Sequence, residues 1–183
     1  MRHPWIPLVT LMAAVMPAAA QPTAGELARD ACAGKTASAQ LVAEAIARAK
    51  ARPELNAFVT IDEAGAMAAA KRADAGKGKA CKPLHGVPIV IKDNIEVAGL
   101  PTTGGTPALK GYQPKADAPV AKKLRDAGAI VIGKTNMHEL AFGISGFNPA
   151  YNTGKEPGVR NAYDAAERDA QRGGRGDRHA DRR

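Results

Sequence analysis

The 183-residue sequence is poor in aromatic residues and in cysteine, and each shortage excludes a class of protein. Aromatic residues make up 4% of the chain, so a hydrophobic core must be built from alanine, valine, isoleucine and leucine. Two cysteines and four histidines, in no zinc-site spacing, exclude a disulfide-dense miniprotein and form no metal motif. Hydrophobic residues at 45% exclude wholesale disorder, and the length has room for one domain.

The first 20 residues carry a pattern of their own. Arg2 and His3 precede a mostly apolar stretch over residues 6–16, and small residues follow as far as Ala20. A charged start, an apolar core and a small-residue cleavage point are typical of a secretory signal peptide. The apolar core is about half of the roughly 20 residues that a membrane-spanning helix needs. We therefore predict a signal peptide over residues 1–20, export to the periplasm or the medium, and no membrane anchor after cleavage.

Export would change the meaning of Cys32 and Cys81. Two lone cysteines in an oxidising compartment can form a disulfide, which in the chain-entropy model would stabilise the fold by about 4 kcal/mol. Two unpaired, buried cysteines that pack as small hydrophobic residues are an almost equal alternative at this stage.

The other end of the chain has an unusual composition. From Ala166 onward it is rich in arginine, glycine and acidic residues, and it has no apolar side chain larger than alanine. Such a segment cannot repay the entropy lost on ordering. We predict a divergent, disordered tail over residues 166–183, which leaves residues 21–165 to carry the function.

Hydrophobic periodicity predicts three helices and a strand before residue 80. A capping-box spacing between Thr23 and Glu26 predicts a helix that ends near Ala33. A second helix begins at Thr36 or Ser38 and ends before Pro53. A short strand over residues 57–61 and an alanine-rich helix over residues 63–75 follow.

The next segment predicts a parallel α/β unit. Residues 87–91 are a continuous apolar run typical of a strand buried on both faces, and residues 129–132 are a second one. Between them lies a loop rich in glycine and proline over residues 98–116, then a helix capped by Asp117. A strand, a crossover helix and a second strand place both strand ends at the edge where such sheets bind ligands.

Lys92 is the sharpest candidate for chemistry, because it lies at the end of the first buried run. Partial loss of water around its ammonium would favour the neutral amine, which can act as a general base. From the residues alone, a side chain that extends into solvent beside Asp93 is the more common outcome.

The other polar candidates are weaker. His85 and His138 lack metal spacing and are interpreted as hydrogen-bonded structural residues. Ser145 misses the nucleophile-elbow pattern by one position, and the glycines at 104 and 105 lack the lysine of a phosphate-binding loop.

Three motifs together resemble one family. They are LHGVPIVIKDNIEVAGLPTTGG from residue 84, DAPVAKKLRDAGAIVIGKTNMHELAFG from residue 117, and NPAYNTGKEP from residue 148 with NAYDA from residue 161. In this order they resemble the amino-terminal half of the amidase signature family, over roughly residues 27–165.

The resemblance implies an amide hydrolase of α/β/α architecture with a mixed sheet, present here as an incomplete N-terminal part. Family members hydrolyse amide bonds with a Ser, cis-Ser and Lys triad and use no metal or cofactor, and their base corresponds to Lys92. Their bridging serine lies in a glycine- and serine-rich loop shortly after the Asn-x-Tyr-Asp segment. Here the arginine-rich tail follows instead, and no serine comes after Ser145.

From this resemblance we expect a chain truncated before both catalytic serines and inactive on its own. The abrupt change of composition is what a shifted reading frame in GC-rich DNA would produce. The expected partner is a small-molecule amide or a peptide amide.

Two other functions stay open. A noncatalytic, exported α/β module could bind such a ligand beside Lys92 without turnover. A polyanion binder could use the net charge of +8, but the charge forms no dense patch, so we do not expect nucleic acid as a partner. The sequence leaves the oligomeric state undetermined.

Overall fold

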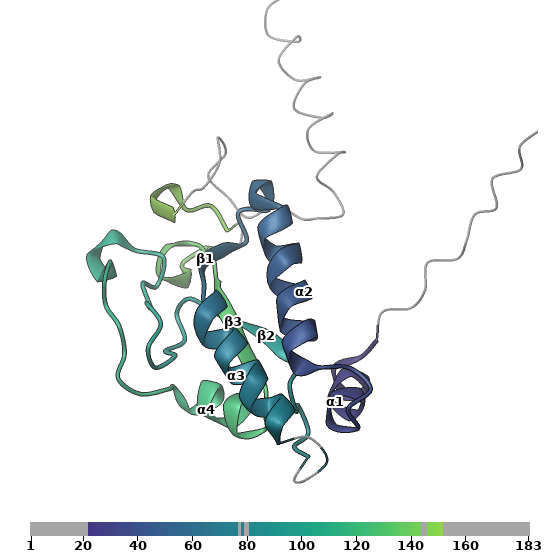
Figure 1. The fold of residues 1–183 in the computed structure, drawn as a ribbon. Coiled ribbons are helices and arrows are strands. Elements are labelled where there is room, and N and C mark those ends of the chain that lie inside the picture. The colour runs from purple at the N-terminus through teal and green to yellow at the C-terminus, as the bar shows by residue number, and fades with distance from the viewer. Residues whose placement is uncertain (1–21, 77, 79–80, 144–145, 152–183) are drawn as a thin grey trace, which may run out of the picture.

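The computed structural model of the chain describes residues 22–76, 78, 81–143 and 146–151. The predicted signal peptide, the arginine-rich tail, the NAYDA segment and Ser145 therefore lie outside the described residues. The main elements are α1 (Ala24–Cys32), α2 (Ser38–Ala51), β1 (Phe58–Ile61), α3 (Glu63–Ala75), β2 (Pro88–Lys92), α4 (Pro119–Asp126) and β3 (Ile130–Thr135), shown in Figure 1.

The sheet confirms the predicted parallel unit. Its strand order is β1-β3-β2, with β2 and β3 parallel and α4 in the connection between them. The first strand pairs antiparallel with β3, so the sheet is mixed. Because β2 and β3 are parallel neighbours, Lys92 and Thr135 finish side by side at the carboxyl edge.

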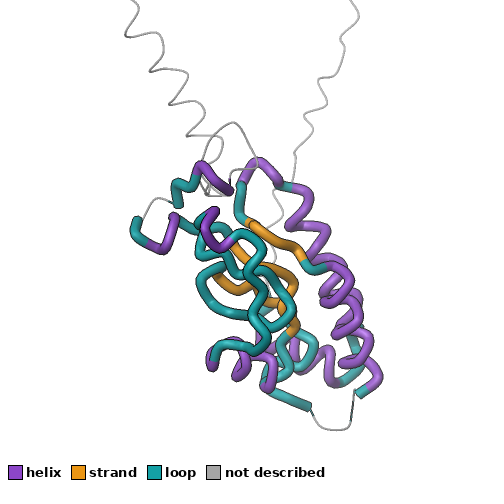
Figure 2. The backbone as a smooth tube through the Cα atoms, turned by 90° about the vertical axis from the view of Figure 1, so that its left-hand side faces the viewer, coloured by secondary structure: helices purple, strands orange, loops and turns teal. Residues whose placement is uncertain are grey.

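Different layers cover the two faces of the sheet. Helices α2 and α3 pack together on one face, and long loops with α4 cover the other, as Figure 2 shows. The helix-side core contains Val42, Ile46, Ala66, Ala70, Ile130 and Ile132. The loop-side core contains Ile91, Val97, Leu100, Ala121 and Val131.

One residue of β3 determines which side chains face the loops. Ile89 pairs with Val131 and Val90 pairs with Gly133, so Ile132 is an extra residue in β3. A Cβ atom on Gly133 would lie 2.3 Å from the carbonyl oxygen of Thr60, so only glycine fits this close approach. The bulge puts Lys134 beside Ile91 in the register, on the loop side of the sheet.

Two predicted helix caps are wrong, and a distant carboxylate explains one of them. The capping box of α1 is confirmed, because the Thr23 hydroxyl accepts from the Glu26 N–H and Glu26 binds back. In α2, by contrast, neither Thr36 nor Ser38 caps the helix. The N–H groups of Ser38 and Ala39 donate to the Asp74 carboxylate at 2.6 and 3.0 Å.

Helix α4 is the second case. Its N-cap is Ala118, which makes no side-chain cap hydrogen bond. Asp117 instead accepts from the Ala98 N–H at 2.7 Å and from the Arg125 guanidinium at 2.9 Å. The carboxylate thus ties the start of the long loop to the end of α4.

The prediction that the first apolar run is buried on both faces is also wrong. Ile91 is buried, but Val90 is 44% exposed and Lys92 is exposed. The physical reason is the strand order, because β2 lies at an edge of the described sheet and the helix pair packs mainly on β3.

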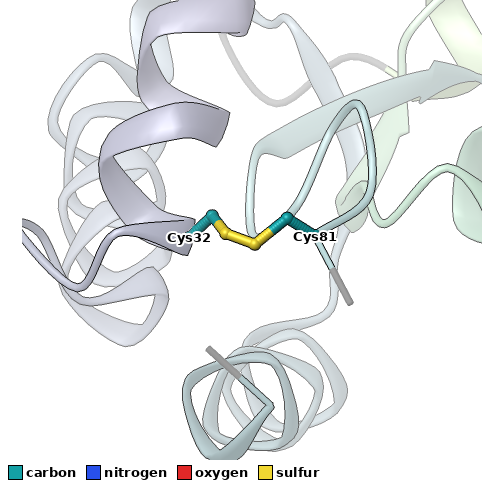
Figure 3. The surroundings of a disulfide bond; sticks show 2 residues. All are labelled: Cys32 and Cys81. Atoms are coloured by element: carbon teal, nitrogen blue, oxygen red, sulfur yellow. A yellow bond between two sulfur atoms is a disulfide. The ribbon is translucent and has the colours of Figure 1, made fainter. Parts of the chain in front are cut away.

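Cys32 and Cys81 form a disulfide, which decides the alternative left open by the sequence. Figure 3 shows the bond between the end of α1 and the segment that leads toward β2. The two Cα atoms are 5.8 Å apart, within the range for disulfides. Among the described residues, no helix is both long and apolar enough to cross a membrane.

Candidate functional site

The three sequence motifs converge at the carboxyl edge of the sheet. Lys92 ends β2 and Asp93 follows it, Lys134 and Thr135 end β3, and the loop over residues 101–106 lies against both strand ends. Such an edge is where parallel α/β sheets bind ligands.

A buried ion pair forms the centre of this edge. The Lys134 ammonium lies 3.1 Å from Asp93 Oδ1, and neither side chain has any exposed surface. Lys134 also donates to Thr102 Oγ1 at 2.8 Å and to the Pro101 carbonyl oxygen at 3.3 Å. Its three N–H groups thus have three acceptors.

Burial dominates the electrostatics of Lys134. Loss of water lowers the pKa of the Lys134 ammonium, because the charged form is less well solvated inside the protein. The hydrogen bond and charge of Asp93, with a smaller effect of Glu96, act in the opposite direction. A buried charge pair of this kind needs complete hydrogen bonding to be tolerated.

The hydrogen bonds of Asp93 are equally complete. Its second carboxylate oxygen accepts from the Thr103 N–H at 3.0 Å and from the Thr103 hydroxyl. Its backbone N–H donates to Thr135 at 3.2 Å, and its carbonyl accepts from Gly104 at 3.2 Å. The residue that follows Lys92 is therefore fixed through both its backbone and its side chain.

The last motif holds the glycine loop from the other side. Asn148 is buried and donates to the carbonyl oxygens of Gly105 at 2.8 Å and Met137 at 2.9 Å. The Tyr151 hydroxyl donates to the Thr106 carbonyl at 3.3 Å. Gly104 and Gly105 both adopt positive φ, at 59° and 69°, which this turn requires.

Lys92 differs from Lys134 in its exposure and in its contacts. Its side chain is exposed, and the described part of the chain offers it no ion pair. Its carbonyl accepts from the Ile95 N–H at 3.0 Å, which turns the chain sharply after the strand. Lys92 thus presents an exposed side chain on a rigid backbone.

The remaining candidates do not join this site. His85 is buried at the opposite end of the strands, as expected of a structural residue, and its Nε2 has no hydrogen-bond partner in the described structure. His138 makes one weak contact, from Nδ1 to the Glu139 carbonyl at 3.4 Å. Ser38 is fully buried in α2. Across the described ranges, no cluster of histidine, cysteine or acidic residues could hold a metal ion.

A groove of about 730 Å³ also lies away from Lys92. It is lined by residues of α3, by Arg125 and by Ile130, at the amino end of β3. The groove and the lysine therefore belong to opposite ends of the strands.

The sequence reasoning missed Lys134, Asp93 and Asn148. One signal was available for Lys134, since a charged residue directly after the apolar run 129–132 and Gly133 continues the strand. The residues alone gave no sign of the bulge that brings Lys134 opposite Ile91 and within reach of Asp93.

The fold and site define a mixed α/β domain with a lysine and a glycine loop at the carboxyl ends of parallel strands. Comparison with known proteins is more specific. The chain belongs to the Amidase family, whose profile matches residues 40–167.

Individual relatives agree with this family. Mandelamide hydrolase of Pseudomonas putida is 50% identical over 132 residues, which are 69% of this chain and 25% of that protein. A glutamyl-tRNA(Gln) amidotransferase subunit of Deinococcus deserti is 46% identical over 124 residues, or 67% of this chain and 25% of that one. The chain thus spans about a quarter of the length of these relatives.

Solved structures share the fold. The native peptide amidase from Stenotrophomonas maltophilia superposes with a TM-score of 0.69 at 33% identity, covering 79% of this chain and 30% of that one. A second structure, described as an amidase, gives a TM-score of 0.66 at 40% identity, covering 75% of this chain and 31% of its own.

Proposed function

We propose that Lys92 is the general base of a site that hydrolyses the carbon–nitrogen bond of a small amide or a peptide amide. The observation that carries the proposal is the exposed Lys92 amine at the carboxyl end of β2, next to a fully hydrogen-bonded loop. The names of two relatives, a mandelamide hydrolase and a peptide amidase, support the substrate class.

The chemistry needs a neutral amine and two serines. Lys92 would accept a proton from a bridging serine, which would deprotonate the serine that attacks the amide carbonyl. Backbone N–H groups of a glycine- and serine-rich loop would stabilise the oxyanion. Ser38 is buried in α2, and Ser145 misses the nucleophile-elbow spacing, so neither serine is a good candidate for these roles.

We therefore propose that the 183-residue chain by itself does not turn over amides. The family match ends at residue 167, close to Ala166, where the composition changes. A shift of reading frame near codon 166 accounts for both observations. Reading the coding DNA one base over would then yield a glycine- and serine-rich continuation, and a continuation without one would refute the shift.

The test of function compares the 183-residue chain with a restored form, which is the longer chain encoded when the reading frame is corrected near codon 166. Mandelamide is the probe, and ammonia release is the measurement. We expect release by the restored form, none by the 183-residue chain, and a loss of about 10²- to 10⁴-fold in kcat/KM for Lys92→Met in the restored form. Lys71→Met, which changes an exposed lysine of α3, is the matched control. Unchanged kcat/KM in Lys92→Met would rule out the role of Lys92. Ligand-induced stabilisation without turnover would favour the binding-module alternative.

We also propose export to the periplasm or the medium. The Cys32–Cys81 disulfide supports it, because structural disulfides persist mainly in oxidising compartments. N-terminal sequencing of the protein recovered outside the cytoplasm should begin at Gln21, and recovery with Met1 retained would contradict the signal peptide.

A further inference from the structure

The buried pair behind Lys92 raises an electrostatic question. Asp93 is the next residue in the chain, and consecutive Cα atoms are about 3.8 Å apart. The side-chain charges of neighbouring residues lie further apart than this, but an uncompensated carboxylate on Asp93 would still favour the charged form of the Lys92 amine, and a general base must be uncharged. The Asp93 charge is compensated, because Lys134 lies 3.1 Å away and both groups are fully buried.

We propose that Lys134 is a positioning residue for the Lys92 amine, which it serves by cancelling the charge of Asp93 and fixing the loop over residues 101–105. The proposal rests on the proposed role of Lys92 as base. Lys134 itself touches no reacting atom in it.

The geometry supports both parts of this role. Lys134 binds Asp93 from β2, and it binds Thr102 Oγ1 and the Pro101 carbonyl from the loop, so one ammonium joins the strand end to the loop. Asp93 in turn accepts from Thr103, whose hydroxyl accepts from the Gly105 N–H at 3.1 Å. A continuous hydrogen-bonded chain thus runs from β3 through the residue next to Lys92 to the glycine turn.

A purely apolar pair would pack this edge without the cost of burying two charges. The described structure keeps the charges, and one of them follows the proposed base directly. Because the charges of Lys134 and Asp93 are opposite, the pair supplies hydrogen bonds to the loop while its net charge near Lys92 stays zero.

The test measures how fast the Lys92 amine reacts, which depends on its uncharged fraction. Full chains are acetylated with acetic anhydride at pH 8 and low salt, and the rate at Lys92 is read by mass spectrometry against the exposed Lys71. A unit charge roughly 8 Å away in water changes this fraction about twofold. We expect Lys134→Met to react about twofold more slowly at Lys92, and the difference to fade in about 1 M salt because the charges are then screened.

The double variant Asp93→Asn with Lys134→Met is the decisive control. It removes both charges, so it should return the Lys92 rate to that of the unchanged protein. A slow rate in both variants, or an effect that persists at high salt, would show that Lys134 acts only by supporting the local structure and would overturn the proposal.

A second measurement needs no variant. In the unchanged protein, the Thr103 and Gly104 amides, which both donate to Asp93, should exchange with solvent far more slowly than the amide of the exposed Lys115 on the same long loop. Equal exchange rates would also overturn the proposal. Neither readout requires amide turnover, so the effect of Lys134 on the Lys92 amine is decided separately from the proposed function, which an inactive restored enzyme would refute.

Discussion

The two ends of the β2–β3 pair are held together by different means. At the carboxyl end, a buried ion pair and its hydrogen bonds tie the strands to the loop over residues 101–106. At the amino end, close backbone contacts join the segments that lead into the two strands, with Gly128 against His85, and the Cys32–Cys81 disulfide ties α1 to the segment that precedes β2. The two ends therefore serve different purposes. The hydrogen bonds at the carboxyl end fix the positions of the groups around Lys92, and the disulfide near the amino end opposes unfolding of the chain.

The sharpest way to break the carboxyl end is Lys134→Met. It leaves the Asp93 carboxylate buried without its partner, and breaking one side of a buried pair typically costs about 3–5 kcal/mol. Urea unfolding followed by circular dichroism measures the loss. Adding Asp93→Asn should recover most of it, since no uncompensated charge remains. Lys71→Met on exposed α3 is the control and should change the free energy of unfolding by less than about 0.5 kcal/mol.

The amino end should respond to loss of the disulfide. Replacing both cysteines with serine removes a crosslink between residues 49 apart, and the typical cost is about 2–4 kcal/mol. Because Cys81 is exposed, dithiothreitol should lower the stability of the unchanged protein toward that of the double variant. The Lys92 acetylation rate should stay the same, and a change in it would mean that the two ends are coupled.

The same contrast explains what the sequence could predict. Helices, strands and the parallel pair follow from local periodicity, and α3 matches its predicted bounds of residues 63–75. The cap of α2 could not be predicted from local sequence, because its acceptor is Asp74, more than 30 residues further along the chain. The Lys134–Asp93 pair depends on a one-residue bulge against Thr60, a contact between strands far apart in the sequence.

Lys92 itself was found from its place at a strand end and from the family resemblance. Its exposure agrees with the more common outcome for such a lysine. The role of base is a separate matter, which the kinetics of the restored form will decide.

The contact between Asp74 and the start of α2, near the amino end of β2, should contribute less to stability. Asp74 caps α2 where that helix approaches the start of β2, since Ser38 lies against Gly86. Asp74→Ala should cost about 1 kcal/mol, as for other lost helix caps. Glu44→Ala, which breaks an exposed ion pair with Arg48 on the same helix, is the control and should cost well under that. Equal losses in the two variants would mean that Asp74 does not act as the cap.

The smallest expected effect is the pH dependence of the carboxyl end. Burial lowers the pKa of Lys134 in the folded chain, so between that pKa and the ordinary lysine value the unfolded chain binds more protons. Stability from this group therefore rises with pH through that window.

Tyr112 contributes in the opposite direction, because its hydrogen bond to Glu96 raises the pKa of its hydroxyl and the unfolded chain loses that proton first. Subtracting the urea stability of Lys134→Met at each pH from 8 to 10.5 removes the Tyr112 contribution, which both proteins share. The difference should grow with pH in favour of the unchanged protein, and a difference that shrinks would mean that Asp93 outweighs burial at Lys134.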